Sequence, residues 1–277
     1  MSSQSKAICV LGSGRCGTSM VTRSINLIGV ELGLNFFPTD STNPKGYWEN
    51  REIVMLHKKF LDSVGNNINQ PQWWHRNEFR HIKQELKEFV ASHFSNKELW
   101  GWKDPRTCQF IELWSEILKE LNVFTHFLIM VRNPVDVAAS FKRAYNADQK
   151  VAMAIWQRAT LLALKKTDGE SRIIFDYNQV LDNSLDCLRA ISNTFDLPMP
   201  QDENKLKNEL NKFVDLKLQH SRTSIENLMN NASIEDEIKE LYQLCVKACN
   251  SREILNTEYF KNQVENLYQS YFKEGKK

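Results

Sequence analysis

The sequence predicts an α/β fold of three layers, in which a central parallel sheet is flanked by helices on both faces. Up to residue 175, short apolar runs alternate with helical patterns, which is typical of parallel strands joined by crossover helices. The rest of the chain is poor in glycine and has no proline after Pro200, so we expect it to be largely helical. We expect a single domain over residues 1–277, with a core over about 6–200 and a helical cover over about 201–277.

The predicted strands are short runs of apolar residues. The first, over residues 7–11, reads AICVL and leads directly into a glycine-rich loop. The clearest, over 126–131, reads HFLIMV, and shorter runs predict two more strands over 99–102 and 172–175. Runs that are apolar throughout indicate strands buried on both faces, as in a parallel sheet.

Apolar side chains at helical spacing predict the helices between these strands. They cover residues 18–30, 110–121, 135–145 and 156–165. Asn133 and Pro134 mark the start of the third, because asparagine is a good N-cap and proline fits the first helical position. A helix of the C-terminal third is predicted from one apolar face, formed by Ile234, Ile238, Leu241 and Leu244.

Composition and charge are those of an ordinary globular protein. The 277 residues are 42% hydrophobic and 25% charged, and 36 basic against 34 acidic side chains leave a net charge of +2. This balance argues against a nucleic-acid partner, so any anion site must be local. The first residues do not read as a signal peptide, and no apolar run approaches the roughly 20 residues of a membrane helix. We therefore expect no membrane span and a cytoplasmic location.

Six cysteines are scattered along the chain without a C-x-x-C pair. Cys245 and Cys249 lie one helical turn apart, and two core thiols are a better explanation of this spacing than a metal site. We expect free thiols, a reducing compartment and no metal.

A glycine-rich loop joins the first predicted strand to the first predicted helix. Residues 10–20 read VLGSGRCGTSM, which follows the Walker A pattern G-x-x-x-x-G-K-[ST] except that Thr18 replaces the lysine. Inward-pointing backbone N–H groups and a helix N-terminus make such a loop an anion cradle. We expect the cradle to be formed by Gly12, Ser13, Gly14, Arg15, Cys16, Gly17, Thr18 and Ser19.

The loop differs from that of an enzyme that hydrolyses nucleoside triphosphates. Those enzymes need the lysine on the phosphates and hold Mg²⁺ with the loop hydroxyl and a strand-end aspartate. Here the strand over 126–131 ends in Arg132, which favours an anion over a cation. Arg15, inside the loop, can supply the missing positive charge as a planar fork.

The segment RNPVDVAAS, residues 132–140, predicts a second anion site. Arg132 leaves the end of a strand, where ligands gather in parallel sheets, and Ser140 follows two helical turns later. An ion pair between Arg132 and Asp136 is the alternative, but beside the loop without a lysine the phosphate interpretation is stronger. Two phosphate sites and no evident metal site suit a nucleotide with phosphate at both ends of its ribose.

These segments resemble the PAPS-dependent sulfotransferases, whose donor is 3′-phosphoadenosine 5′-phosphosulfate (PAPS). The loop GSGRCGTS resembles the family's 5′-phosphate loop, and Arg132 with Ser140 resembles its 3′-phosphate pair. NPKGYWEN at 43–50 and GWKDPRT at 101–107 look like acceptor-side motifs of bacterial sulfotransferases and are similar to motifs of protein-tyrosine sulfotransferases. The resemblance spans about residues 7–222.

The resemblance implies a P-loop NTPase-like fold and an enzyme that moves a sulfuryl group from PAPS to a hydroxyl or an amine in line, without a metal. It places an acidic base after the first helix, where Glu49 follows Tyr47 and Trp48 in an aromatic segment. Lys103 would neutralise the leaving phosphate or the moving sulfuryl group, and Arg15 would share that role. The alternative for Glu49 is an N-cap or first-turn glutamate of the helix predicted through residues 53–60, and the alternative for Lys103 is a strand-end lysine paired with Asp104.

Three further residues are candidates by resemblance. His57 competes with Glu49 as the base, since cytosolic small-molecule sulfotransferases use histidine, but it lies inside a predicted helix beside two lysines, which predicts an exposed side chain. Tyr177, just after the last predicted strand, is a candidate contact for adenine. Arg222 in LQHSR is a candidate for closing over the donor, and the chain lacks the R-K-G loop of the cytosolic enzymes.

Two other functions stay open from the sequence. A small-molecule kinase would bind ATP with Mg²⁺, and it needs a lysine and a carboxylate that the motifs do not supply. A non-catalytic nucleotide-binding protein gains support if Glu49 and Lys103 lie far from the loop. The acceptor can be a hydroxylated small molecule, a lipid head group, a sugar or a peptide tyrosine, and a homo-oligomer is compatible with the sequence.

Overall fold

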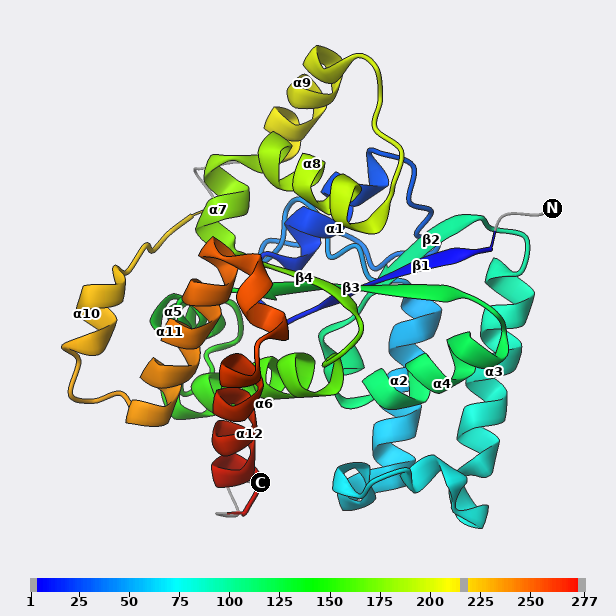
Figure 1. Cartoon of the computed structure of the whole chain (residues 1–277), viewed down its shortest axis with the longest axis horizontal. Coiled ribbons are helices and arrows are strands. Elements are labelled where there is room, and N and C mark those ends of the chain that lie inside the picture. Colours follow the sequence, from blue (N-terminus) through cyan, green and yellow to red (C-terminus); the bar gives the residue numbers. More distant parts are fainter. Residues whose placement is uncertain (1–3, 215–218, 274–277) are drawn as a thin grey trace.

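Four parallel strands form the centre of the molecule. The computed structural model describes residues 4–214 and 219–273, and its strands run in the order β2-β1-β3-β4 (Figure 1). Their bounds are Lys6–Leu11 for β1, Leu99–Lys103 for β2, Phe124–Val131 for β3 and Ser171–Asp176 for β4. Each neighbouring pair is parallel, so the carboxyl ends of all four strands meet at one edge. The predicted parallel sheet and its four strands are confirmed.

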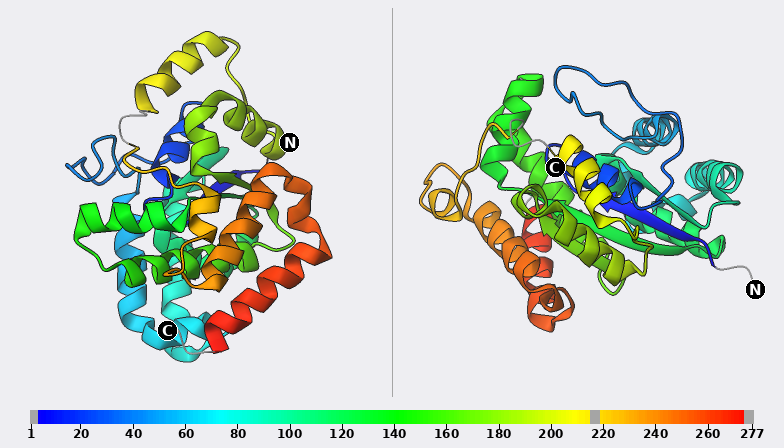
Figure 2. Two further views of the ribbon diagram at one scale, coloured as in Figure 1. Left: turned by 90° about the vertical axis from the view of Figure 1, so that its left-hand side faces the viewer. Right: turned by 90° about the horizontal axis from the view of Figure 1, so that it is seen from above.

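Helices cover both faces of this sheet, as strands that are buried along almost their whole length require. α1 (Thr18–Asn26) and α8 (Ser184–Phe195) lie on one face, and α4 (Ile111–Glu120) and α6 (Gln149–Lys166) lie on the other (Figures 1 and 2). α11 (Asp236–Asn250) packs against the edge strand β4. The predicted three-layer α/β architecture is therefore confirmed.

The remaining helices surround these layers and connect them. The α-helices are α2 (Arg51–Val64), α3 (Arg80–Phe94), α5 (Pro134–Tyr145), α7 (Tyr177–Asp182), α9 (Glu203–Phe213), α10 (Ile225–Met229) and α12 (Glu258–Lys273). The 3₁₀ helices are η1 (Gly65–Asn69), η2 (Trp73–His75), η3 (Asn77–Phe79), η4 (Pro105–Gln109) and η6 (Arg252–Asn256).

Capping residues explain where several helices begin and end. The side chain of Asn133 accepts a hydrogen bond from the backbone N–H of Val135 and starts α5 as predicted. α6 begins well before the predicted residue 156, because Asp148 caps its first turn. α1 ends before the predicted residue 30, because Gly29 takes a φ of 101° and turns the chain away from the helix.

The C-terminal third is helical, as predicted. The apolar face formed by Ile234, Ile238, Leu241 and Leu244 is buried. Cys245 and Cys249 are also buried in the core, with free thiols. No helix within residues 4–214 and 219–273 is both long and apolar enough to cross a membrane.

Gly12 fixes how the loop after β1 passes its neighbouring strand. Its φ is 136°, and a Cβ atom built there would lie 2.4 Å from the backbone oxygen of Met130 in β3. Only glycine permits both the backbone angle and this approach. The glycine of the loop is therefore required by packing against the sheet before any ligand is considered.

Candidate functional site

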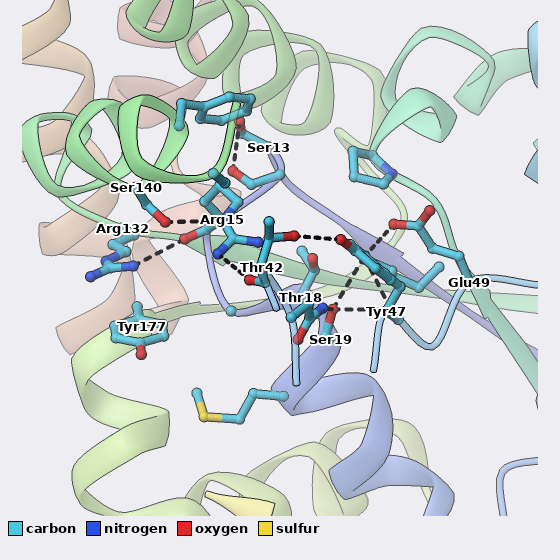
Figure 3. A pocket seen from close by; sticks show the side chains of 18 of the residues that line it. Ser13, Arg15, Thr18, Ser19, Thr42, Tyr47, Glu49, Arg132, Ser140 and Tyr177 are labelled. Atoms are coloured by element: carbon cyan, nitrogen blue, oxygen red, sulfur yellow. Dashed lines mark hydrogen bonds and ion pairs between the residues drawn. The ribbon is translucent and has the colours of Figure 1, made fainter. Parts of the chain in front are cut away.

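A cavity of about 910 Å³ lies at the carboxyl ends of the strands. The end of β2 contributes Lys103. The loops after β1 and β3 contribute Ser13 and Arg132, and the first residue of α7, directly after β4, is Tyr177 (Figure 3). A parallel sheet brings these four ends together although they are far apart in the sequence. The cavity is thus the place where the glycine-rich loop, the segment after β3 and the two predicted acceptor motifs meet.

The glycine-rich loop forms one wall of this cavity. Gly17 has a left-handed backbone (φ 83°) and is the N-cap of α1, so no side chain caps the amide groups of the first helical turn. These amides and the positive end of the helix favour an anion. Six of the eight predicted loop residues line the cavity: Ser13, Gly14, Arg15, Gly17, Thr18 and Ser19. Gly12 and Cys16 do not, because Gly12 packs on β3 and the Cys16 side chain is fully buried.

The predicted second anion site lies at the other side of the loop. Arg132 is only 5% exposed, and its guanidinium lies 4.2 Å from the centre of the Tyr177 ring. It donates to the backbone oxygens of Arg15 (3.3 Å) and Ser221 (3.1 Å), while its buried Nε has no hydrogen-bond partner. No carboxylate of the described chain forms an ion pair with Arg132, and each of its terminal nitrogens keeps one N–H that these bonds do not use, so the guanidinium can bind an anion.

Arg15 connects the two anion sites. Its Nε donates to the hydroxyl of Ser140 at 3.0 Å, and one terminal nitrogen donates to the backbone oxygen of Thr42 at 2.9 Å. Asp136, the alternative partner of Arg132, instead accepts hydrogen bonds from the backbone N–H and the hydroxyl of Thr223. The ion pair between Arg132 and Asp136 is therefore not formed, and Arg132 and Ser140 both line the cavity.

Lys103 and Glu49 meet beside the hydroxyl end of the loop. The Nζ atom of Lys103 lies 2.6 Å from Oε1 of Glu49, 3.3 Å from the backbone oxygen of Tyr47 and 3.4 Å from Oγ of Ser19. The two charged side chains are 4% and 13% exposed. Lys103 pairs with Glu49, and the alternative pair with Asp104 is not formed. Glu49 precedes α2, whose N-cap is Asn50.

The cavity is strongly basic. Glu49 is the single carboxylate among its lining residues in the described chain, and it is already paired with Lys103. The basic side chains that line it are Arg15, Lys45, Lys103, Arg106, Arg132, Arg143 and Arg158. Such an excess of positive charge in a low-dielectric recess favours a ligand that carries several negative charges.

The segment over residues 40–49, before α2, closes one side of the cavity. The hydroxyl of Tyr47 donates to Oδ2 of Asp40 at 2.7 Å, and Thr42 bonds to both of these side chains. The hydrogen bonds from Tyr47 and Thr42 lower the pKa of the exposed Asp40 carboxyl to about 2. They fix the backbone oxygen of Thr42 where it accepts from Arg15.

His57 is placed differently from the sequence prediction. It is fully buried, because this face of α2 packs against η4, and the His57 ring lies against Trp114 of α4. Its Nδ1 lies 2.8 Å from Oδ2 of Asp104, and the indole N–H of Trp114 donates to its Nε2 at 2.9 Å. The indole is only a donor, so Nε2 accepts and Nδ1 carries the proton. The prediction of an exposed His57 is wrong, and both ring nitrogens are engaged away from the cavity.

The contact between His57 and Asp104 predicts a pH-dependent stability. Burial alone would raise the pKa of Asp104, but the hydrogen bond from His57 and the charge of Arg106 outweigh it and lower the pKa from 3.8 to about 2. Because the folded-state pKa is the lower one, the stabilisation is present above pH 4 or so and is lost as the pH falls towards about 2. We expect Asp104→Asn to reduce the free energy of unfolding by about 2 kcal/mol at neutral pH.

Urea unfolding of both proteins at several pH values between neutral and acid tests this expectation. The difference between wild type and Asp104→Asn should shrink as the pH falls below about 4. A difference that stays constant over this range would show that the ionised carboxylate is not the cause.

Arg222 does not reach the cavity. It is paired with Asp182 at 2.5 Å, its side chain is 53% exposed, and it lines a separate cavity of about 400 Å³. His220 of the same segment does line the main cavity. The structure therefore brings six of the eight predicted loop residues, Arg132, Ser140, Tyr177 and the Glu49–Lys103 pair to one cavity. Gly12, Cys16, His57 and Arg222 lie outside it.

The wall of the cavity formed by η4 and one face of α6 was not predicted from the sequence. This wall contains Arg106, Gln109, Ile155, Arg158, Ala159 and Leu162. The four residues from α6 follow the helical spacing i, i+3, i+4 and i+7, so they share one face. An arginine inside an otherwise apolar helical face is the signal in the sequence that could have marked it.

No protein-family model and no curated protein matches the sequence. Among solved structures, the chain is similar to the sulfotransferase domain of the Synechococcus PCC 7002 olefin synthase (15% identity, TM-score 0.49, covering 87% of this chain and 94% of that one). It is also similar to the sulfotransferase domain of the curacin biosynthetic pathway (15%, 0.43, 98% and 99%). A third is retinol dehydratase in complex with androsterone and the inactive cofactor PAP (13%, 0.39, 95% and 80%). Identities and TM-scores of this size assign no activity to the chain.

Proposed function

We propose that this protein is a sulfotransferase that moves a sulfuryl group from PAPS to a hydroxyl or an amine of an acceptor. The observation that carries the proposal is the presence of two anion sites in one cavity, joined by Arg15. One is the loop without a lysine, and the other is Arg132 with Ser140. A nucleotide with one phosphate on the 5′ side and one on the 3′ side of its ribose could place one phosphate in each of these two sites.

The residues present fit such a donor. Each terminal nitrogen of Arg132 uses one N–H on a backbone oxygen and keeps a second one, which can form a charge-assisted hydrogen bond to a 3′-phosphate. The hydroxyl of Ser140 also lines the cavity and is bonded to Nε of Arg15. A Cβ atom on Gly17 would lie 2.6 Å from the Tyr177 ring, so the loop and this ring are in direct contact beside the cavity. An aromatic ring next to a phosphate loop can hold an adenine or ribose face.

The Glu49–Lys103 pair supplies the groups that transfer to an acceptor requires. When bound, PAPS supplies the activated sulfuryl group. The acceptor oxygen or nitrogen bonds to sulfur, and adenosine 3′,5′-bisphosphate leaves. Lys103 holds Oε1 of Glu49 in place, so the other carboxylate oxygen can accept the proton from the acceptor. The ammonium of Lys103, which also contacts Ser19, places positive charge where the leaving phosphate would develop negative charge.

The other two functions find less support. A kinase site would place a lysine at position 18 and an aspartate at the end of β3, where this chain has Thr18 and Arg132. A non-catalytic protein is disfavoured because Glu49 and Lys103 lie directly beside Ser19 of the loop. Six buried free cysteines agree with the reducing compartment in which we place the protein, such as the cytoplasm.

Thermal unfolding with adenosine 3′,5′-bisphosphate tests the proposal. A ligand at 100 times its dissociation constant stabilises a protein by about 2.7 kcal/mol, which raises the unfolding temperature measurably. We expect this rise in the wild type and its loss in Arg132→Ala. Arg189→Ala removes an arginine from the exposed surface of α8, outside the cavity, and should keep the full rise.

ATP with Mg²⁺ is the comparison ligand. If it stabilises the protein and the bisphosphate does not, the kinase interpretation replaces the sulfotransferase. If neither ligand stabilises the protein, nucleotide binding at this cavity is excluded at the concentrations used.

A further inference from the structure

We infer that the acceptor carries an anionic group, a carboxylate or an equivalent oxyanion, which Arg158 binds at the cavity wall formed by η4 and α6. The inference rests on the proposed function, and it narrows the class of acceptor for the same cavity. Seven basic side chains line the cavity, and the proposed donor and transfer step account for three of them, Arg15, Lys103 and Arg132. Arg158 is one of the other four.

Arg158 is held in place without being neutralised. One terminal nitrogen of its guanidinium donates to Oδ1 of Asn69 at 2.6 Å and to Oε1 of Gln109 at 3.4 Å. The guanidinium also lies 5.2 Å from the centre of the Phe272 ring in α12. These partners are all neutral, and no carboxylate pairs with Arg158 within the described ranges. A half-buried, ordered and uncompensated positive charge is therefore present at the cavity wall.

The position of Arg158 relates it to the acceptor rather than to the donor. Its partner Gln109 belongs to η4, which begins at Pro105, directly after Lys103 and Asp104. The wall of η4 and α6 therefore continues from the Lys103–Glu49 pair, where the acceptor hydroxyl must lie. Arg106 belongs to the same wall. One terminal nitrogen of its guanidinium donates to Oδ1 of Asp104, and the other N–H groups of the guanidinium can still donate to a ligand.

The neighbours of Arg158 define the rest of the acceptor. Ile155, Ala159 and Leu162 lie on the same face of α6 and give the wall an apolar surface around one positive charge. This combination suits an acceptor with an apolar body, an anionic group at one end and the reactive hydroxyl or amine at the other. A sugar without charge, or a neutral sterol, would leave the charge of Arg158 without an anionic partner.

Two isosteric probes test this inference: 4-hydroxybenzoate, which is an anion at neutral pH, and 4-hydroxybenzamide, which is not. Each is titrated into the protein saturated with adenosine 3′,5′-bisphosphate, so that both phosphate sites are already filled, and binding is followed by calorimetry or by thermal unfolding. We expect 4-hydroxybenzoate to bind about tenfold more tightly or better than the amide, as for a charge-assisted hydrogen bond. Arg158→Gln should abolish this preference, and Arg158→Lys should retain part of it.

The control removes an equal charge elsewhere. Lys150→Gln alters an exposed lysine at the start of α6 that does not line the cavity, and it should keep the preference for the anion. Equal responses to the two probes, including no response to either, contradict the inference, as does a preference that survives in Arg158→Gln. Failure of the bisphosphate to bind instead contradicts the proposed function, so the two failures are distinguishable.

Discussion

Replacing Lys103 by methionine should lower kcat/KM for sulfuryl transfer by a factor of about 10²–10³ while the protein stays folded. Methionine keeps most of the side-chain volume but removes the ammonium that contacts both Glu49 and Ser19. The positive charge beside the leaving phosphate is then lost, and Glu49 loses the partner that orients it. The measurement is transfer of a radiolabelled sulfuryl group from PAPS to a panel of phenols, sterols, sugars and tyrosyl peptides.

Two further variants separate chemistry from folding. Glu49→Gln keeps the shape of the side chain but cannot accept a proton, and we expect it to lower kcat more than it weakens bisphosphate binding. Lys97→Met makes the same change as Lys103→Met just before the other end of β2, where Lys97 pairs with Glu31 on the surface, and activity should persist. If Lys103→Met retains activity near the wild-type level, this lysine has no part in the transfer step.

Gly12→Ala should destabilise the fold by about 3 kcal/mol or more, or prevent folding altogether. The new Cβ would meet the backbone oxygen of Met130 at 2.4 Å, and neither β1 nor β3 can move without disturbing the centre of the sheet. The left-handed φ of 136° adds backbone strain for any residue with a side chain. Urea unfolding of the purified variant gives the loss of stability directly.

Gly29→Ala is the matched control for this substitution. Gly29 also has a positive φ, of 101°, but a Cβ there would meet nothing within 4 Å. It should therefore cost only the backbone strain, about 1 kcal/mol. Equal losses for the two variants would mean that strain alone, and not the close approach to β3, explains the requirement for Gly12.

The sheet, and the place where the two candidate anion sites lie, could be predicted from the sequence because their signals are local. Strand β3 reads as a continuous apolar run, and the end of β3 supplies Arg132 within the same stretch of sequence. The loop before α1 carries its glycines and hydroxyl at fixed spacing. In such segments the residues that determine the conformation and those that meet the ligand are neighbours, so one pattern predicts both.

The features that were missed depend on contacts between distant segments. His57 reads as a surface residue beside lysines, but Asp104, 47 positions away, and Trp114 form its hydrogen bonds in the core. Arg158 reads as one more charged residue of a helix, yet it is held by Asn69, 89 positions away. The spacing of residues along one helix does not reveal which partner another element will bring, so only the folded structure shows these roles.

The segment that crosses the Arg132 side of the cavity is held largely through its main chain. Arg132 donates to the carbonyl of Ser221, Asn133 donates to the carbonyl of Thr223, and the Thr223 amide donates to Asp136. Every residue has a backbone carbonyl, and every residue except proline has a backbone N–H. These three hydrogen bonds can therefore form with almost any residue type at positions 221 and 223. The path of this segment consequently depends on the side chains of Arg132, Asn133 and Asp136 more than on the residue types of the segment itself. A sequence pattern built on the segment would therefore carry little information about where it lies.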